Sequence, residues 1–305
     1  MLNEARDLGL RDRILAMRSL DSFAPLEDES LALVAEHARL CSFRKGEVVT
    51  VEGQRPTALF VVLEGSIRVE RLGQEVVVVQ RARGVGFLSV LAQDDVGVTS
   101  VALEDTVCLE IPAAAFLRAM EEDFSLMRNT LRLSAGQLVR DRGSLPVGPE
   151  RKLVAAAGEY RERELTMVER IIQLRQGPVF SQCNLDAVIE LVRRSREVRF
   201  EPGDTIFEVG DPSTFSFGID YGIVRCSSAN GDSVDVGYGF AMGVMDSFAQ
   251  QPRSYRAVAQ TKVVGFRIDS AVFMSVLESY FELAIGLQIG ISRQLLDGDR
   301  EWTSD

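Results

Sequence analysis

Histidine, cysteine and long apolar runs are scarce in this chain of 305 residues, and each scarcity excludes a class of function. The single histidine, His37, argues against a histidine metal centre or a histidine general base, the roles that histidine fills most often. No segment approaches the run of about 18 apolar residues that a membrane span needs, so no span is expected. The four cysteines are too few and too scattered for a disulfide framework or a paired-cysteine metal site, and are expected to be small buried residues: Cys41, Cys108, Cys183 and Cys226.

Basic residues are also fewer than acidic residues. The 34 Lys and Arg residues are outnumbered by 45 Asp and Glu, which gives a net charge of −11. Nonspecific binding to nucleic acid needs a basic patch, and the sequence has no obvious one, so no nucleic-acid partner is expected. The first twenty residues mix acidic residues with arginines and contain no continuous apolar core, which argues against a secretory signal and favours a cytoplasmic location.

The rest of the composition is that of a globular protein, with 46% hydrophobic and 26% charged residues. At roughly 150 residues per domain the length suits two domains. An internal repeat with an offset of 157 residues supports this number. The repeat is carried by glycines and phenylalanines: Gly46, Gly53, Gly65, Gly86, Phe23, Phe43, Phe60 and Phe116 match Gly203, Gly210, Gly222, Gly243, Phe180, Phe200, Phe217 and Phe273.

Each copy contains short β-rich runs separated by glycine turns, at 43–51, 59–70, 76–80 and 101–111, and again at 200–208, 216–226, 234–238 and 256–268. This pattern predicts a mainly β fold with flanking helices (α+β), each copy forming an antiparallel barrel or sandwich. Helical spacing marks residues 31–40 and 186–194 and a closing helix over 276–296.

The expected organisation is an N-terminal helical segment (1–22), a first domain (23–141), a linker with a charged connecting helix over 151–167 (142–166), and a second domain (167–305). The helix that closes the first copy carries an apolar stripe with alternating spacings of three and four. Such a stripe packs on its own domain or, as the alternative, joins two chains in a homodimer. Its residues are Leu117, Met120, Phe124, Met127 and Leu131.

The glycine pattern resembles that of the cyclic nucleotide-binding domain family. The run Gly46-Glu47-Val48-Val49 with Gly53 and Gly65, and its copy Gly203-Asp204-Thr205-Ile206 with Gly210 and Gly222, are similar to the glycine ladder of that family. The resemblance covers nearly the whole chain and implies two tandem β-roll domains of jelly-roll type joined by helices, as in kinase regulatory subunits and catabolite activators.

The same resemblance implies where a ligand would bind in the second copy. Family members present a short helix N-terminus and an arginine to the cyclic phosphate, and a glutamate to the ribose hydroxyl. Arg253 and Ser254 match the phosphate-binding pair, whereas Val244 stands where the glutamate belongs, with Asp246 nearby as a substitute. The candidate ligand-binding residues are Gly243, Val244, Asp246, Ser247, Arg253 and Ser254.

The first copy departs further from the family pattern. The offset places Val96 at the arginine position and Phe87 at the glutamate position, where a phenylalanine can fill the cavity. An anion bound there would lose its water without gaining a countercharge. This site is expected to be degenerate: Gly86, Phe87, Leu88, Ser89 and Val96.

The sequence gives little evidence for other kinds of binding or catalytic site. Gly237-Tyr238-Gly239 lacks the third glycine spacing of a dinucleotide loop, and phosphate-loop, zinc-protease and serine-hydrolase motifs are absent. The acidic clusters at Asp94-Asp95 and Glu121-Glu122-Asp123 suit a solvated turn or face.

Too few residues follow Met274 for a DNA-binding module, and the N-terminal tail lacks the paired arginines of a kinase pseudosubstrate. The sequence therefore predicts a non-enzymatic regulatory protein with an unidentified protein partner, no metal and no cofactor, in which a cyclic nucleotide or related phosphate ligand binds the second copy. The alternative is a ligand-independent scaffold.

Overall fold

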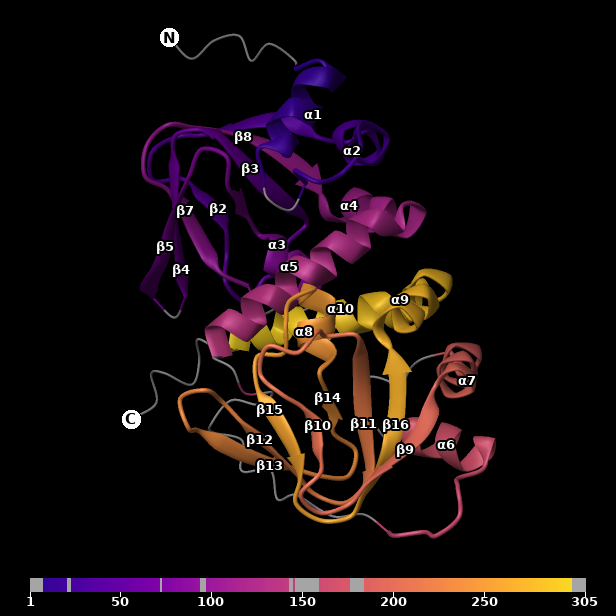
Figure 1. Ribbon diagram of the computed structural model, residues 1–305. Coiled ribbons are helices and arrows are strands. Elements are labelled where there is room, and N and C mark those ends of the chain that lie inside the picture. Colours follow the sequence, from indigo (N-terminus) through magenta and orange to yellow (C-terminus); the bar gives the residue numbers. More distant parts are fainter. Residues whose placement is uncertain are drawn as a thin grey trace. The chain divides into compact units, whose positions relative to one another are not determined.

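The computed structural model describes residues 8–20, 23–71, 73–93, 97–142, 145, 159–175 and 184–297 (Figure 1). The chain divides into two compact units. One comprises Met1–Thr130 with Gln288–Asp305, and the other comprises Leu131–Leu287. Each unit contains one β-roll, and the domain boundaries expected from the sequence stay predictions.

The first β-roll consists of two four-stranded antiparallel sheets with strand orders β1-β8-β3-β6 and β2-β7-β4-β5. Helices stand before and after these strands in the chain. The elements are α1 (Leu10–Arg18), α2 (Asp28–Ala35), β1 (Arg39–Phe43), β2 (Val48–Thr50), β3 (Ala58–Glu64), β4 (Ser66–Arg71), β5 (Gln74–Gln80), β6 (Gly84–Val85), α3 (Phe87–Ala92), β7 (Thr99–Ala102), β8 (Thr106–Pro112), α4 (Ala113–Glu122) and α5 (Phe124–Arg142).

The second β-roll repeats this topology, with strand orders β9-β16-β11-β14 and β10-β15-β12-β13. Its elements are α6 (Met167–Leu174), α7 (Leu185–Arg194), β9 (Arg196–Phe200), β10 (Thr205–Phe207), β11 (Phe215–Tyr221), β12 (Val224–Ser227), β13 (Ser233–Val236), β14 (Ala241–Met242), α8 (Val244–Ala249), β15 (Arg256–Ala259), β16 (Val263–Asp269), α9 (Ser270–Ser279) and α10 (Phe281–Asp297).

The repeat expected from the sequence is confirmed strand by strand. β1 begins at residue 39 and β9 at residue 196, and the short helices α3 and α8 begin at 87 and 244, all with the offset of 157. The cores repeat as well, because Phe43 and Phe60 form an edge-to-face pair with ring centroids 5.7 Å apart, and Phe200 and Phe217 form the same pair at 5.6 Å. The two tandem β-rolls with flanking helices that the sequence predicts are therefore present.

The boundaries of three predicted elements are wrong. The predicted strand over 101–111 is two strands, β7 and β8, separated by a turn. The predicted helix over 31–40 ends at Ala35, because the chain turns there and enters β1 at Arg39. The closing helix predicted over 276–296 is two helices, α9 and α10, which are bent by 111° at Tyr280, a residue with an extended φ of −131°.

The same break divides the closing helix of the first copy. Asp123 has φ −129° and ends α4, so the stripe from Leu117 to Leu131 lies on two helices instead of one. The spacing of apolar residues continues across this bend and does not reveal it. The prediction of one continuous heptad stripe is therefore wrong. Among the described residues, no single helix is long and apolar enough to cross a membrane. Taken together, the bent pair α9–α10 reaches the length and apolar composition of a membrane span. Many of its apolar side chains are buried in the protein.

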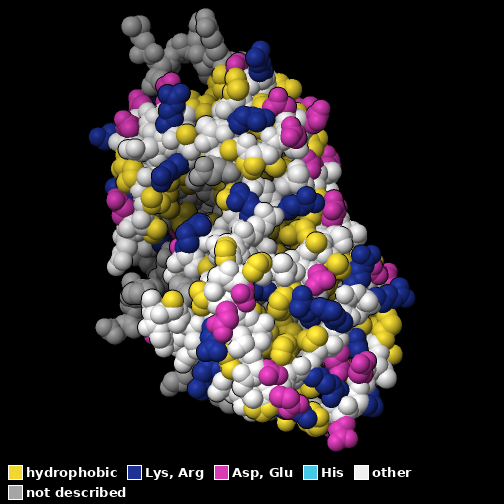
Figure 2. Space-filling view, viewed as in Figure 1, with side chains coloured by type: hydrophobic (Ala, Val, Ile, Leu, Met, Phe, Trp, Pro, Cys, Tyr) yellow, Lys and Arg dark blue, Asp and Glu magenta, His cyan; other side chains and the backbone are white. Residues whose placement is uncertain are grey.

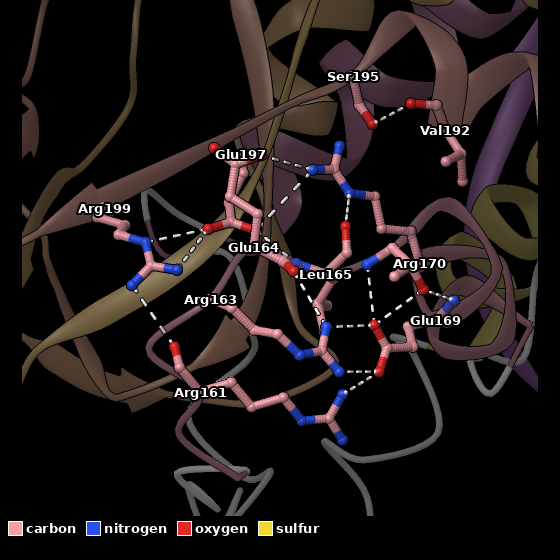
Figure 3. A network of polar contacts seen from close by, with 11 residues as sticks. Arg161, Arg163, Glu164, Leu165, Glu169, Arg170, Val192, Ser195, Glu197 and Arg199 are labelled. Atoms are coloured by element: carbon pink, nitrogen blue, oxygen red, sulfur yellow. Dashed lines mark hydrogen bonds and ion pairs between the residues drawn. The ribbon is translucent and has the colours of Figure 1, made fainter.

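The connecting helix predicted over 151–167 is absent from its described part, because residues 159–166 are not helical and 146–158 lie outside the described residues. The helix begins only at α6, where Thr166 and Glu169 form a reciprocal capping box. The charges in this segment are tied to the second β-roll instead. Figure 3 shows Arg161 and Arg163 converging on Glu169, with Arg163 Nη2 2.6 Å from the carboxylate.

A buried carboxylate completes the anchor of this segment. The side chain of Glu197 on β9 is 3% exposed and accepts hydrogen bonds from the Leu165 amide at 3.2 Å and from Arg199 Nη2 at 2.8 Å (Figure 3). The guanidinium of Arg170 lies 5.0 Å from the ring centroid of Phe266 and donates through Nε to the Leu165 carbonyl. The segment before α6 is thus held on β9 by charge-assisted hydrogen bonds.

On the face of the molecule that Figure 2 shows, basic and acidic side chains are interspersed and no large patch of one sign is visible. The expected lack of a nucleic-acid partner stays a prediction. An interspersed surface does not create the strong positive field that phosphate backbones require.

All eight glycines of the repeated ladder have positive φ, between 71° and 97°. Two of them, Gly65 and Gly222, also lie against backbone. A Cβ at Gly65 would lie 2.8 Å from Thr106 Cα, and one at Gly222 would lie 2.9 Å from Val263 Cα. These two corners, between β3 and β4 and between β11 and β12, therefore exclude any side chain.

Gly222→Ala is expected to destabilise the second β-roll more than Gly231→Ala does. Gly231 has φ +94° but nothing within 4 Å of an added Cβ, so it carries only the backbone cost of about 1–2 kcal/mol. At Gly222 the collision with backbone adds at least about 1 kcal/mol more. Urea unfolding followed by far-ultraviolet circular dichroism measures both variants, and equal midpoints would contradict the close approach.

Candidate functional site

The candidate site is the loop and helix that connect β14 to β15 in the second β-roll. Gly243 lies between β14 and α8, at the N-cap of α8, and has φ +71°. A Cβ at this position would collide with Nη1 of Arg253, so the glycine is required by the arginine as well as by its own backbone. The chain then runs through α8 and returns to β15 through Pro252 and Arg253.

Arg253 is 2% exposed, and its guanidinium is surrounded by the protein. Nη1 donates to the Gly243 carbonyl at 2.9 Å, and Nη2 donates to the Phe215 carbonyl. The guanidinium carbon lies 4.4 Å from the ring centroid of Phe207 and 4.7 Å from that of Phe215. Among the described residues, Nε has no hydrogen-bond partner. The arginine predicted to bind phosphate is therefore buried in the cassette, with its Nε donor unused among the described residues.

Burial lowers the pKa of Arg253, and the nearby charge of Asp246 opposes this shift. Arginine still keeps its proton, because its ordinary pKa lies above about 12. The site therefore contains a permanent positive charge in a largely apolar interior.

Asp246 on α8 is the buried carboxylate of the site, at 1% exposure. Its Oδ2 accepts a hydrogen bond from the Ser254 amide at 3.3 Å, and its Oδ1 has no partner among the described residues. Burial raises the pKa of Asp246, whereas the Ser254 hydrogen bond and the charge of Arg253 lower it. Asp246, Arg253 and Ser254, which the sequence analysis selected, are thus brought together. The ribose-binding role expected for Asp246 stays a prediction.

Ser247 and Tyr255 tie the two ends of the cassette to each other. Ser247 Oγ donates to the Gly243 carbonyl at 2.7 Å, and the Gly243 amide donates to the Tyr255 hydroxyl at 2.9 Å. Tyr255 is buried, which raises its pKa. Val244, at the glutamate position, is half-buried at the first residue of α8.

Sequence reasoning missed Phe207, Phe215 and Tyr255 as parts of the site. Phe207 and Phe215 lie on β10 and β11, far from the cassette in sequence, and aromatic residues in strands suggest ordinary core packing. Only the fold places their rings beside the guanidinium.

The first β-roll has a different arrangement at the equivalent position. Phe87 packs against Phe23 and Phe116, with ring centroids 5.9 and 5.8 Å apart. Both aromatic partners come from the helical part of the unit, because Phe116 lies on α4 and Phe23 precedes α2. The expectation that the Phe87 ring fills a cavity stays a prediction. Gly86 begins α3 with φ +86°, Leu88 is half-buried and Ser89 is buried. Val96 lies outside the described residues.

The remaining candidates do not form sites in the described part of the chain. His37 is exposed in the turn that follows α2, and its Nδ1 lies 3.2 Å from the Leu33 carbonyl. Glu121 and Glu122 are exposed, which agrees with a solvated face, and Asp94-Asp95 lie outside the described residues. No group of three metal-ligating side chains is found among the residues that the structure describes.

A family model described as cyclic nucleotide-binding domain matches residues 40–123 and 197–280. No curated protein matches the chain. Solved structures with a similar fold include a regulatory subunit of a cAMP-independent protein kinase A from Trypanosoma brucei (17% identity, 89% of this chain, 88% of that chain, TM-score 0.35).

The regulatory domain of Toxoplasma gondii protein kinase A is also similar (13% identity, 96% of this chain, 97% of that chain, TM-score 0.36). So is the N-terminal domain of a Streptomyces coelicolor transcriptional regulator (25% identity, 43% of this chain, 95% of that chain, TM-score 0.38).

Asp246→Asn is expected to stabilise the protein at neutral pH. Because burial raises the pKa of Asp246, the folded chain holds this proton more tightly than the unfolded chain, and the free energy of unfolding falls as pH rises through the folded pKa. The asparagine can still accept from Ser254 and removes the buried charge.

The gain should vanish below the unfolded pKa of about 4, where both states are protonated. Thermal unfolding between acid and neutral pH measures it. Asp235→Asn, at an exposed carboxylate on β13, is the control. A gain that is equal in both variants, or that persists in acid, would contradict the assignment.

Proposed function

Because the chain belongs to the cyclic nucleotide-binding domain family, we propose that it is a cytoplasmic, non-enzymatic regulatory protein whose second β-roll binds a phosphate-containing ligand through Arg253. The observation that carries this proposal is the buried guanidinium at the end of the cassette, with Nε unused among the described residues. A charged donor kept in an apolar interior is costly unless a partner makes use of it.

A phosphate would bind by exchanging partners within the cassette. Nε is available in the described cassette, and each Nη carries a second N–H besides the one that it donates to a backbone carbonyl, so Nε and one Nη can make a bidentate contact with a phosphate. Each hydrogen bond between the guanidinium and a phosphate oxygen joins two charged groups and contributes roughly 1.5–3 kcal/mol. The Ser254 amide is a second donor, once Asp246 releases it.

The ribose would be recognised weakly. Val244 offers no acceptor for a ribose hydroxyl, and the carboxylate of Asp246 is engaged with Ser254. We expect 2′-deoxy and ribose forms of a cyclic nucleotide to bind with similar affinity. If a charged group did bind the 2′-hydroxyl, removal of that hydroxyl would lower the affinity roughly tenfold or more.

The first β-roll is proposed to be structural. Phe87 packs in an aromatic cluster, and Val96 stands at the arginine position in the sequence. Neither side chain supplies a charge to a phosphate, so a ligand is expected only in the second copy.

A bound ligand can pass a signal from the cassette to the helices that follow. Phe248 on α8 lies against Phe273 on α9, with ring centroids 5.5 Å apart. Movement of α8 around a phosphate would therefore displace α9 and change a surface available to a protein partner. The size of the shift is set by the difference in ligand affinity between the two states.

A second function, a ligand-independent interaction protein, is favoured by one observation. Arg253, Asp246, Ser247 and Tyr255 all have hydrogen-bond partners within the cassette itself. In that case both β-rolls are scaffolds and their helices bind the partner constitutively.

Calorimetric titration with cyclic AMP, cyclic GMP and their 2′-deoxy forms distinguishes the two. The sensor should bind in the micromolar range, and Arg253→Ala should weaken binding about 10- to 100-fold. Arg225→Ala is the matched control, because Arg225 is exposed and pairs with Asp235 at 2.8 Å. Arg253→Lys retains the charge without the planar fork and should fall between wild type and alanine.

Circular dichroism establishes that each variant is folded. Absence of heat at millimolar ligand with the folded wild type would overturn the sensor and leave the interaction protein. Unchanged affinity in folded Arg253→Ala would place any binding elsewhere.

A further inference from the structure

Two cysteines lie directly opposite each other in the first β-roll, away from the candidate site. Cys41 on β1 pairs with Cys108 on β8 in the antiparallel register. Cys108 is 0% exposed at the centre of its sheet, and Cys41 is half-buried and packs on the same core cluster. Both are free thiols, and their side chains occupy the same face of the sheet.

The spacing of this pair is close to that of a disulfide. Residues directly opposite in an antiparallel pair have Cα atoms about 4.5–5.5 Å apart, within the usual disulfide range of about 4.4–6.8 Å. Cys41 Sγ lies 3.6 Å from the Cys108 carbonyl oxygen, so the thiol already points across to its partner strand. β1 is an edge strand with only β8 as neighbour, which leaves it free to make the small adjustment that a bond requires.

The two thiols are chemically unequal. A hydrogen bond from the Cys108 thiol lowers the pKa of Cys41, and the same interaction together with burial raises the pKa of Cys108. Cys41 is also the more exposed of the two. The accessible sulfur is thus the better nucleophile, and the buried one is placed to resolve the product.

We propose that Cys41 and Cys108 form a peroxide-sensitive dithiol that closes to a disulfide between β1 and β8. The Cys41 thiolate attacks one oxygen of hydrogen peroxide, the O–O bond breaks, and the departing hydroxide takes a proton to become water. Cys108 sulfur then attacks the sulfur of the Cys41 sulfenic acid. The S–O bond breaks, a second water leaves with the Cys108 proton, and the S–S bond forms. One peroxide is reduced and two thiols are oxidised.

This dithiol is specific to the first copy. The positions equivalent to Cys41 and Cys108 are Val198 and Gly265, which are partners in the same register. Cys226, the other described cysteine, is opposite Val234 on one side and Ala257 on the other. The modification would therefore fix the edge strand of one β-roll and leave the other unchanged.

The test treats the reduced chain of 305 residues, carrying Cys183→Ser, with hydrogen peroxide. Free thiols are then alkylated and peptides are mapped without reductant. We expect one cross-linked peptide joining Cys41 and Cys108, a mass loss of about 2 Da for the two hydrogens removed, and reversal by dithiothreitol. The oxidised form should also unfold at a higher temperature, because the cross-link constrains the unfolded chain.

Variants assign the roles of the two sulfurs. Cys108→Ala should block the cross-link and leave a Cys41 sulfenic acid that dimedone captures, whereas Cys41→Ser should leave Cys108 unmodified. Cys226→Ser is the matched control, because it removes a buried thiol with no thiol opposite, and it should cross-link like the parent. If Cys108→Ala fails to fold, the peptide map of the parent protein alone decides. Full alkylation of both thiols after peroxide treatment, or a cross-link that involves Cys226 instead, would overturn the proposal.

Discussion

The guanidinium of Arg253, which keeps its proton and its positive charge, lies inside the second β-roll. The groups around it take the place of solvent. Two backbone carbonyls, two aromatic rings and a nearby carboxylate together replace the water that Arg253 loses on burial. The guanidinium also fills the space beside Gly243, where an added Cβ would meet Nη1 and where the positive φ already favours glycine. The same side chain joins the start of α8 to the start of β11, through its hydrogen bonds to the carbonyls of Gly243 and Phe215.

The two β-rolls show how one backbone frame supports two interiors. Glycines at the corners and the edge-to-face phenylalanine pairs recur at the same positions in both copies, so the strands take the same paths. The side chains between them differ. The first copy has an aromatic cluster around Phe87 and a thiol pair, and the second has a buried arginine and carboxylate. Backbone constraints keep the fold, and the cassettes are free to diverge in chemistry.

Helix ends were predicted less well than strands, for a physical reason. The period of apolar residues continues across Asp123 and Tyr280, although the chain bends at both. A bend depends on what each half packs against, which a local pattern does not contain. In the segment before α6, the alternating charges suit a solvated helix equally well. The capping box at Thr166 and the anchor on Glu197 fix its conformation instead.

The fold could be read from the amino-acid sequence because its constraints are local and repeated: a positive φ or a close backbone approach demands glycine wherever it occurs, and the offset of 157 doubles the signal. The residue types at the candidate site, Arg253 and Asp246 among them, were also identified there. Their partners were not. Phe207, Phe215 and the pairing of Cys41 with Cys108 depend on strands far apart in the chain, and only folding brings these side chains within contact distance.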